Sequence, residues 1–331
     1  MQVYIIVPFF QHKRGILARA IRSVCAQRQI FDHPDVERIE LIVVDDASPV
    51  RAESELNDVQ FPVHLKYRII HQDNQGPAGA RNRGLDVADK DGFIAFLDSD
   101  DEWGPDHLAR AVTSLQSGYD VYACNWIPLN ATKDVMRMPS RRSLTLTPSA
   151  ILGDAGEIVG DPLISEMNAP MCKLSGLAYR MSRFSSLRFD ARLRNASEDR
   201  LFVYMMMMSR PKVMISKIIE VYSGRGINVY ESVPWGGVSS LAIVYDQTSA
   251  TLKARDQLTH HEKAKTMLRR QLCTQRRDFA AIFWHMLVRF RLPLRQLARQ
   301  MMLDPFVMCE LLRYPLRRLD HLGKSRRTEG H

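Results

Sequence analysis

The sequence predicts an α/β fold, in which a mostly parallel sheet with flanking helices is followed by a helical C-terminal extension. Over the first 127 residues, short runs that are apolar almost throughout alternate with amphipathic stretches. Such runs are typical of parallel strands that are buried on both faces. Acidic residues gather where two of these runs end, and ligands of parallel sheets bind at the carboxyl ends of the strands. From about residue 250 the chain is expected to be wholly helical.

The elements of the first 127 residues follow from composition and spacing. The apolar runs are rich in β-branched and aromatic residues, which favour strands. The stretch after the first run spaces its apolar residues three or four apart, on one helix face, and prolines open two later helices, since proline is favoured in a first turn. The predicted strands are residues 2–8, 39–45, 65–70, 92–97 and 119–126. The predicted helices are residues 15–28, 52–58, 77–88 and 105–116.

The rest of the chain is predicted to differ in character. Residues 128–175 are irregular, and a loop this long inside a domain is usually functional or mobile. Residues 176–222 return to mixed strands and a helix that begins near Ser197. Apolar residues from Phe279 to Phe290 share one helix face. We therefore predict a domain of residues 1–250, with halves 1–127 and 128–250, and a basic helical region of residues 251–331.

Composition limits the class and compartment of the protein. The chain is 45% hydrophobic and 25% charged, as in a soluble globular protein. It has no charge-free apolar run of about eighteen residues and no signal-peptide pattern, so we expect neither a spanning helix nor export. Its five cysteines are scattered without a CxxC pair, which argues against zinc and disulfides and fits a reducing cytoplasm.

The net charge of +9 comes from the C-terminal region. Residues 253–331 hold 18 Lys and Arg against 7 Asp and Glu, whereas the first 252 residues hold 28 against 30. Such a basic segment can contact the phosphate of lipid or of nucleic acid.

The most informative segment is LDSDDEW, residues 97–103, at the end of the apolar run 92–97. Its acids Asp98, Asp100 and Asp101 repel one another unless a cation lies among them. The alternative is a turn with solvated acids.

Two earlier segments are candidates for ligand contacts. In VVDDASP, residues 43–49, Asp46 lies just past a strand end and can accept from a base or a ribose; the alternative is a helix cap. In NQGPAGARNRG, residues 74–84, small residues at a helix start allow close approach, with Arg81 and Asn82 one turn in. The alternative there is a helix start whose small face packs well.

A fourth segment is ASEDRLF, residues 196–202. Ser197 is a candidate N-cap, with Glu198 and Asp199 in the first turn of the helix. The alternative is that the two acids only complement the helix dipole.

The series VVDDAS, NQGPAGARN, LDSDDEW and SED, in this order, resembles the family-2 glycosyltransferases of the GT-A fold. The resemblance covers roughly residues 1–240 and includes the opening IIVPFF and the block LRFDARLRNASEDRLF. It implies a Rossmann-like nucleotide-sugar-binding fold, with residues 1–127 as the nucleotide-binding half and residues 128–250 as the acceptor-binding half.

The resemblance also implies roles for single residues. Asp100, in the DxD motif, would hold Mn²⁺ or Mg²⁺ on the diphosphate of the donor, with Asp101 as a neighbour. Asp199 would be the general base. Gln11 departs from the pattern, in which a small polar residue is common. The implied nucleotide-sugar-binding residues are Pro8, Phe10, Asp46, Arg81, Asn82, Asp98 and Ser99.

The implied reaction is an inverting, metal-dependent hexosyl transfer. A sugar would pass from a UDP-sugar to a hydroxyl of a glycan or lipid-linked oligosaccharide, and the overall pattern is similar to the enzymes of bacterial exopolysaccharide assembly of the succinoglycan type. A divalent cation would offset the charge that develops on the diphosphate, and one carboxylate would take the proton of the acceptor hydroxyl.

Two other function classes are open at this point. A sugar-nucleotide nucleotidyltransferase should carry a glycine-rich phosphate loop after the first strand, but PFFQHKRG lacks it. A nucleic-acid-binding protein is suggested by the Arg-rich C-terminal region, which however contains no recognisable recognition module, so we expect no nucleic-acid partner.

Three further features have two readings each. Residues 255–331 are expected to contact a membrane surface, as a peripheral protein on the cytoplasmic face of the inner membrane, or else to pack on the core or on a second subunit of a homodimer. Trp103 and Trp235 are candidates for stacking on sugar or base, with core packing as the alternative. The run Met205–Met208 is expected to be core, with a cofactor or copper role as the alternative.

Overall fold

The computed structural model describes residues 1–31, 33–224 and 234–316. The chain forms two compact units, one of residues 1–194 and 198–228 and one of residues 195–197 and 229–331. The predicted domain boundary at residue 250 falls inside a helix of the second unit. The functional halves divided at residue 127 stay a prediction.

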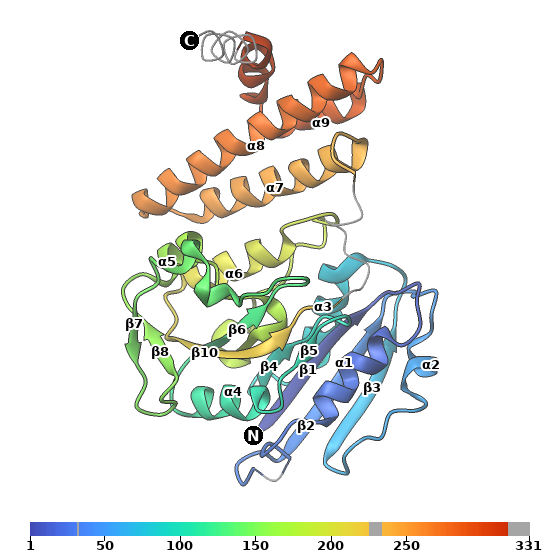
Figure 1. Ribbon diagram of the computed structural model, residues 1–331, viewed down its shortest axis with the longest axis vertical. Helices are drawn as coiled ribbons and strands as arrows, with labels where there is room; N and C mark the ends of the chain where they lie inside the picture. The colour runs from blue at the N-terminus through green and yellow to red at the C-terminus, as the bar shows by residue number, and fades with distance from the viewer. Residues whose placement is uncertain (32, 225–233, 317–331) are drawn as a thin grey trace. The chain divides into compact units, whose positions relative to one another are not determined.

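One mixed sheet forms the centre of the first unit (Figure 1). Its order is β3-β2-β1-β4-β9-β6-β10-β8-β7, with β5 paired to β10. Strands β3, β2, β1 and β4 are parallel to one another, as predicted, whereas β9 runs antiparallel between β4 and β6. The strands are β1 (Gln2–Phe9), β2 (Arg38–Asp45), β3 (Leu65–His71), β4 (Phe93–Phe96), β5 (Glu102–Trp103), β6 (Val121–Ile127), β7 (Leu146–Pro148), β8 (Ala155–Ile158), β9 (Leu177–Arg180) and β10 (Val213–Tyr222).

Helices cover both faces of the parallel strands, because β1 is apolar on both. Val3, Ile5 and Val7 share a buried cluster with residues of α1 and α4. The opposite face of β1 meets α3, where a Cβ added at Gly84 would lie 2.4 Å from a methyl group of Ile6. The helices of this unit are α1 (Ile16–Cys25), α2 (Ala52–Leu56), α3 (Gly76–Val87), α4 (His107–Gln116), α5 (Pro162–Asn168) and α6 (Glu198–Met208).

Residues 128–175, predicted to be irregular, contain short elements. Strands β7 and β8 pair with each other, and β8 joins the sheet through β10. Helix α5 follows, with the Asp161 side chain accepting from the Ile164 backbone N–H at 3.1 Å as its N-cap.

The second unit is helical in its described residues. It consists of α7 (Val238–Gln257), α8 (Glu262–Val288), α9 (Leu294–Leu303) and a further helical stretch over residues 307–316. The predicted apolar face of α8 is confirmed from Phe279 to Met286, which pack with Leu241 and Val307. Phe290 is an exception and lies beyond the end of α8, fully exposed. None of the described helices combines the length and the apolarity that crossing a bilayer requires.

Candidate active site

Two of the predicted segments, residues 43–49 and residues 97–103, meet at the carboxyl ends of the parallel strands. Strands β2 and β4 flank β1 on either side, and Asp45 is in register with Phe9. The Asp46 N–H donates to the Phe9 carbonyl at 3.0 Å, and the Leu97 N–H donates to the Ile6 carbonyl at 3.1 Å. Both acidic segments therefore leave the sheet beside the carboxyl end of β1.

Asp46 holds the chain that leads into α3. Its buried carboxylate accepts from the backbone N–H groups of Gln75 at 2.7 Å and Gly76 at 2.8 Å, and from the side-chain amide of Gln72 at 2.7 Å. Gly76 has a φ of 78°, which favours glycine. Asp46 therefore holds the backbone before α3 and is not the cap of the next helix, α2, where the Ala52 N–H donates to Asp45 at 3.0 Å. A contact of Asp46 with a nucleotide base stays a prediction.

Arg81, in the segment of residues 74–84, connects the segments of residues 97–103 and 196–202. Its guanidinium lies 2.6 Å from the Asp98 carboxylate and 3.3 Å from the Glu198 carboxylate, and over the ring of Phe189 at 5.4 Å. Burial disfavours the charge of Arg81, but Asp98 and Glu198 outweigh that penalty and raise its pKa. Three segments far apart in the sequence are thus linked through one buried cation.

Asp101 is neutralised by residues that the sequence analysis missed. The Lys173 ammonium lies 2.7 Å from its carboxylate, which also accepts from the Ser175 hydroxyl and, at 3.1 Å, from the Gly224 N–H. Lys173 and Ser175 come from the loop before β9, more than seventy positions along the chain, and a lone lysine there gives no pattern to detect.

Asp100 differs from Asp98 and Asp101, whose carboxylates each form an ion pair with a basic side chain. Within the described chain, no other residue donates a hydrogen bond to its carboxylate or forms an ion pair with it. Burial, together with Asp98 and Asp101, raises the pKa of Asp100 to about 7. A divalent cation would relieve this repulsion with the oxygen ligands that it prefers, so the residues present fit a metal site.

Gly224 is closely packed against the same turn. An ideal Cβ on Gly224 would lie 1.6 Å from the Asp100 carbonyl oxygen, so any side chain must push the turn away. We expect Gly224→Ala to destabilise the protein by about 1–3 kcal/mol, as overpacking does. Gly153→Ala is the control, since a Cβ there meets nothing within 4 Å. Equal unfolding midpoints in urea for the two variants would contradict the packing argument.

The ED pair opens α6, as predicted. Glu198 points to Arg81, and its pKa rises to about 7 because burial and Asp199 outweigh the effect of that guanidinium. Asp199 is exposed, and its carboxylate accepts from the Arg200 N–H at 2.6 Å. The predicted N-cap Ser197 is wrong, because its buried hydroxyl has no hydrogen-bond partner in the described residues. Asp199 as the base stays a prediction.

Asn82 has a structural partner. Its side-chain amide donates to the Phe189 carbonyl at 2.9 Å and accepts from the Phe189 N–H at 2.8 Å. This pair of bonds places the Phe189 ring against Arg81. The geometry favours a positioning role, whereas the predicted nucleotide contact of Asn82 remains untested.

The other predicted nucleotide-binding residues lie near the carboxyl ends of the same parallel strands. Pro8 is buried near the end of β1, and Phe10 follows it, half-buried. Ser99 is buried, and its hydroxyl accepts from the Gln11 side-chain amide at 3.4 Å. Their contacts with a nucleotide stay predictions.

The aromatic candidates differ from each other. Trp103 is core: its ring is buried, packs 4.7 Å from the ring of His107 and donates to the Ser175 carbonyl. Trp235 is exposed and packs edge-on against His285. In the predicted core run Met205–Met208, the two central residues are fully buried and the outer two half-buried.

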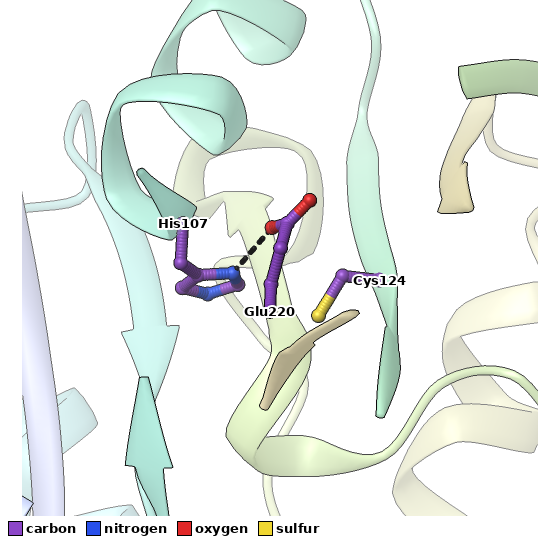
Figure 2. A group of neighbouring side chains, drawn as sticks. All are labelled: His107, Cys124 and Glu220. Carbon is purple, nitrogen blue, oxygen red and sulfur yellow. Dashed lines mark hydrogen bonds and ion pairs between the residues drawn. The ribbon is translucent and has the colours of Figure 1, made fainter. Parts of the chain in front are cut away.

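A separate cluster of buried titratable side chains consists of His107, Cys124 and Glu220 (Figure 2). The Glu220 carboxylate lies 2.9 Å from His107 Nδ1, and it accepts from Arg110 at 2.8 Å and Tyr122 at 2.7 Å. Burial, followed by Glu220, raises the pKa of Cys124 well above its usual value, so the thiol stays protonated. A carboxylate already shared by these donors, beside a neutral thiol, makes a structural network and a poor cation site.

Comparisons with known proteins agree on one family. The family model described as Glycosyl transferase family 2 matches residues 4–174. The chain is 32% identical over 238 residues to the succinoglycan biosynthesis protein ExoW of Rhizobium meliloti, covering 69% of this chain and 70% of that protein. It is 34% identical over 116 residues to a Campylobacter jejuni GalNAc(5)-diNAcBac-PP-undecaprenol beta-1,3-glucosyltransferase, about 35% of each chain.

Among solved structures, the chain resembles S. aureus TarS 1–349 in complex with UDP-GlcNAc. The TM-score is 0.61 at 17% identity, over 94% of this chain and 88% of that one. At this identity the likeness concerns the fold alone, and it confirms the predicted GT-A fold.

Proposed function

Because the chain belongs to glycosyl transferase family 2 and is therefore a glycosyltransferase, we propose that it is an inverting, metal-dependent enzyme that uses a UDP-sugar. Family membership also decides between transfer of a sugar and formation of a sugar nucleotide, in favour of the first. The observation that carries the proposal is the Arg81 bridge, which links Asp98 and Glu198 at the edge of the sheet.

The donor is proposed to bind along the acidic turn. Asp100 would hold Mn²⁺ or Mg²⁺, since its carboxylate is crowded by two other acids and is not engaged by another side chain among the described residues. When bound, the cation would stabilise the negative charge of the departing diphosphate. Asp98 is kept ionised because Arg81 and Lys173 outweigh the effect of burial and lower its pKa, and it would accept hydroxyls of the ribose.

The acceptor hydroxyl is proposed to lose its proton to Asp199. Glu198 is engaged by Arg81, which leaves Asp199 as the exposed carboxylate of the pair. One base and a single displacement give inversion at the anomeric carbon.

The acceptor is proposed to be a glycan or a lipid-linked oligosaccharide in bacterial exopolysaccharide synthesis. The similarity to a succinoglycan biosynthesis protein and to an enzyme named for an undecaprenol-linked substrate supports this. An acceptor on a lipid carrier favours a peripheral location on the cytoplasmic face of the inner membrane, with the basic residues 255–331 as the contact.

The proposal is tested by a screen for release of the nucleoside diphosphate over a panel of nucleotide sugars, with Mn²⁺, Mg²⁺ or chelator. We expect release with one or a few UDP-sugars, and none in chelator. Turnover that persists in chelator would contradict the metal, and turnover with a GDP-sugar alone would contradict the donor.

Asp100→Ala tests the metal ligand by itself. We expect the affinity for UDP in the presence of Mn²⁺ to fall by at least about 10–100-fold, as even loss of outer partners of a metal does, and the residual affinity to be independent of metal. Calorimetry with and without Mn²⁺ measures both values. Asp91→Ala, an exposed acid before β4, is the control, and unchanged affinity in Asp100→Ala would remove it from the site.

A further inference from the structure

The turn between α8 and α9 carries apolar side chains that are largely exposed in the part of the chain that the structure describes. Val288, Phe290, Leu292 and Leu294 are 71%, 99%, 53% and 61% exposed. Scattered single apolar residues on a surface are ordinary, but four within seven positions are not.

The turn is nevertheless ordered at its start. The N–H groups of Arg289 and Arg291 both donate to the Met286 carbonyl, at 3.1 and 3.0 Å, and the Phe290 N–H donates to the Leu287 carbonyl at 3.0 Å. Phe290 has a left-handed backbone, with a φ of 56°. These bonds end α8 and hold the aromatic side chain outward.

Arginines alternate with the apolar residues of the turn. Arg289, Arg291 and Arg295 are exposed, and no ion pair involves them within the part of the chain that the structure describes. No Asp or Glu occurs between Asp278 and Asp304. The turn is thus uniformly positive and apolar at once.

We propose that this turn, residues 288–295, is a lipid-binding element that inserts Phe290 and its apolar neighbours into an anionic membrane surface while the arginines bind phosphate headgroups. This deepens the proposed peripheral location, on which it rests, by assigning it to eight residues of the second unit. An apolar partner protein would leave the arginines unpaired, whereas an anionic bilayer satisfies both kinds of side chain.

The charge is tested by co-sedimentation of the full chain with phosphatidylcholine vesicles, with and without phosphatidylglycerol. We expect binding only to the anionic vesicles, and a loss of about a hundredfold in partitioning for the triple variant Arg289→Gln, Arg291→Gln, Arg295→Gln. The matched control is Arg269→Gln, Arg270→Gln, Arg277→Gln, which removes the same charge from exposed positions of α8 and should lose less than about tenfold.

The apolar part is tested by Phe290→Asn with Leu292→Asn, because asparagine tolerates the left-handed backbone at residue 290. We expect this variant to lose vesicle binding while its circular dichroism and its UDP release with a soluble acceptor stay unchanged. The matched control is Val63→Ser, at an exposed apolar position of the first unit.

Three results would overturn the inference. Turn variants that sediment like the wild type would move the contact elsewhere, leaving the peripheral location intact. A wild type that releases UDP but ignores anionic vesicles would remove the lipid contact without touching the transferase reaction. A dimer in sedimentation velocity that dissociates in Phe290→Asn with Leu292→Asn would assign the turn to a second copy of the chain.

Discussion

Asp199→Asn should lower kcat by about 10²–10⁴-fold, the usual contribution of a positioned general base. The amide cannot take the proton of the acceptor hydroxyl, but it keeps the size of the side chain at the start of α6. Because Asp199 is exposed and the Arg81 bridge runs through Glu198, the affinity for UDP should stay within about twofold. Steady-state kinetics and calorimetry on the same preparation measure both quantities.

Glu198→Gln is the matched variant. It keeps a hydrogen-bond acceptor for Arg81 and removes the carboxylate whose pKa is raised to about 7. If Glu198 were the base, kcat of the wild type would fall as the pH drops below about 7, because a protonated carboxyl cannot take the proton of the acceptor hydroxyl. This inflection would vanish in Glu198→Gln. That outcome, with Asp199→Asn turning over at the wild-type rate, would transfer the role to Glu198.

Glu220→Ala should lower the free energy of unfolding by about 3–5 kcal/mol, because it removes the acceptor that the buried His107 and Tyr122 share and one of the two carboxylate partners of Arg110. Glu220 is 2% exposed, and its carboxylate binds Arg110, Tyr122 and Ser216 as well as His107. It ties α4 to β10 (Figure 2). Urea denaturation at neutral pH, with Glu37→Ala at an exposed position as the control, measures the difference.

The stability difference between the wild type and Glu220→Ala should depend on pH. Burial opposes ionisation of Glu220, but His107 and its other partners outweigh it and lower its pKa below the usual 4.5. The stability from this group is therefore present above pH 4.5 and is lost as the pH falls through the lowered pKa. The difference between wild type and Glu220→Ala should narrow in acid. A constant difference would contradict the network, and stoichiometric zinc in the purified protein would show a metal centre instead.

Local patterns in the sequence were enough to predict most strands and helices of the parallel half of the sheet. The apolar run that became β1 is buried on both faces, so its composition indicated both its strand and its two layers of helices. The antiparallel insertion of β9 between β4 and β6 was not predicted. Its four residues resemble any short apolar run, and the choice of neighbours depends on contacts made across the whole sheet.

The candidate site shows the same division. The acids at 98–101 and 198–199 were identifiable because strand ends and helix starts are local features. The sequence did not indicate which of these acids has a partner, because Arg81, Lys173 and Gly224 reach the cluster from three other segments of the chain. Asp46 illustrates the reverse case, in which a residue chosen for a ligand is found holding the backbone before α3.

By itself, the sequence determined the α/β class, the strands beside the site, the acidic segments and the basic C-terminal region, because hydrophobic periodicity and charge are properties of neighbouring residues. Only the tertiary structure decided that Arg81 bridges Asp98 and Glu198, that Lys173 neutralises Asp101 while Asp100 is left without such a partner among the described residues, and that Phe290 points outward. Each of these depends on the distance between side chains that are separated along the chain, and burial then sets how strongly their charges act on one another.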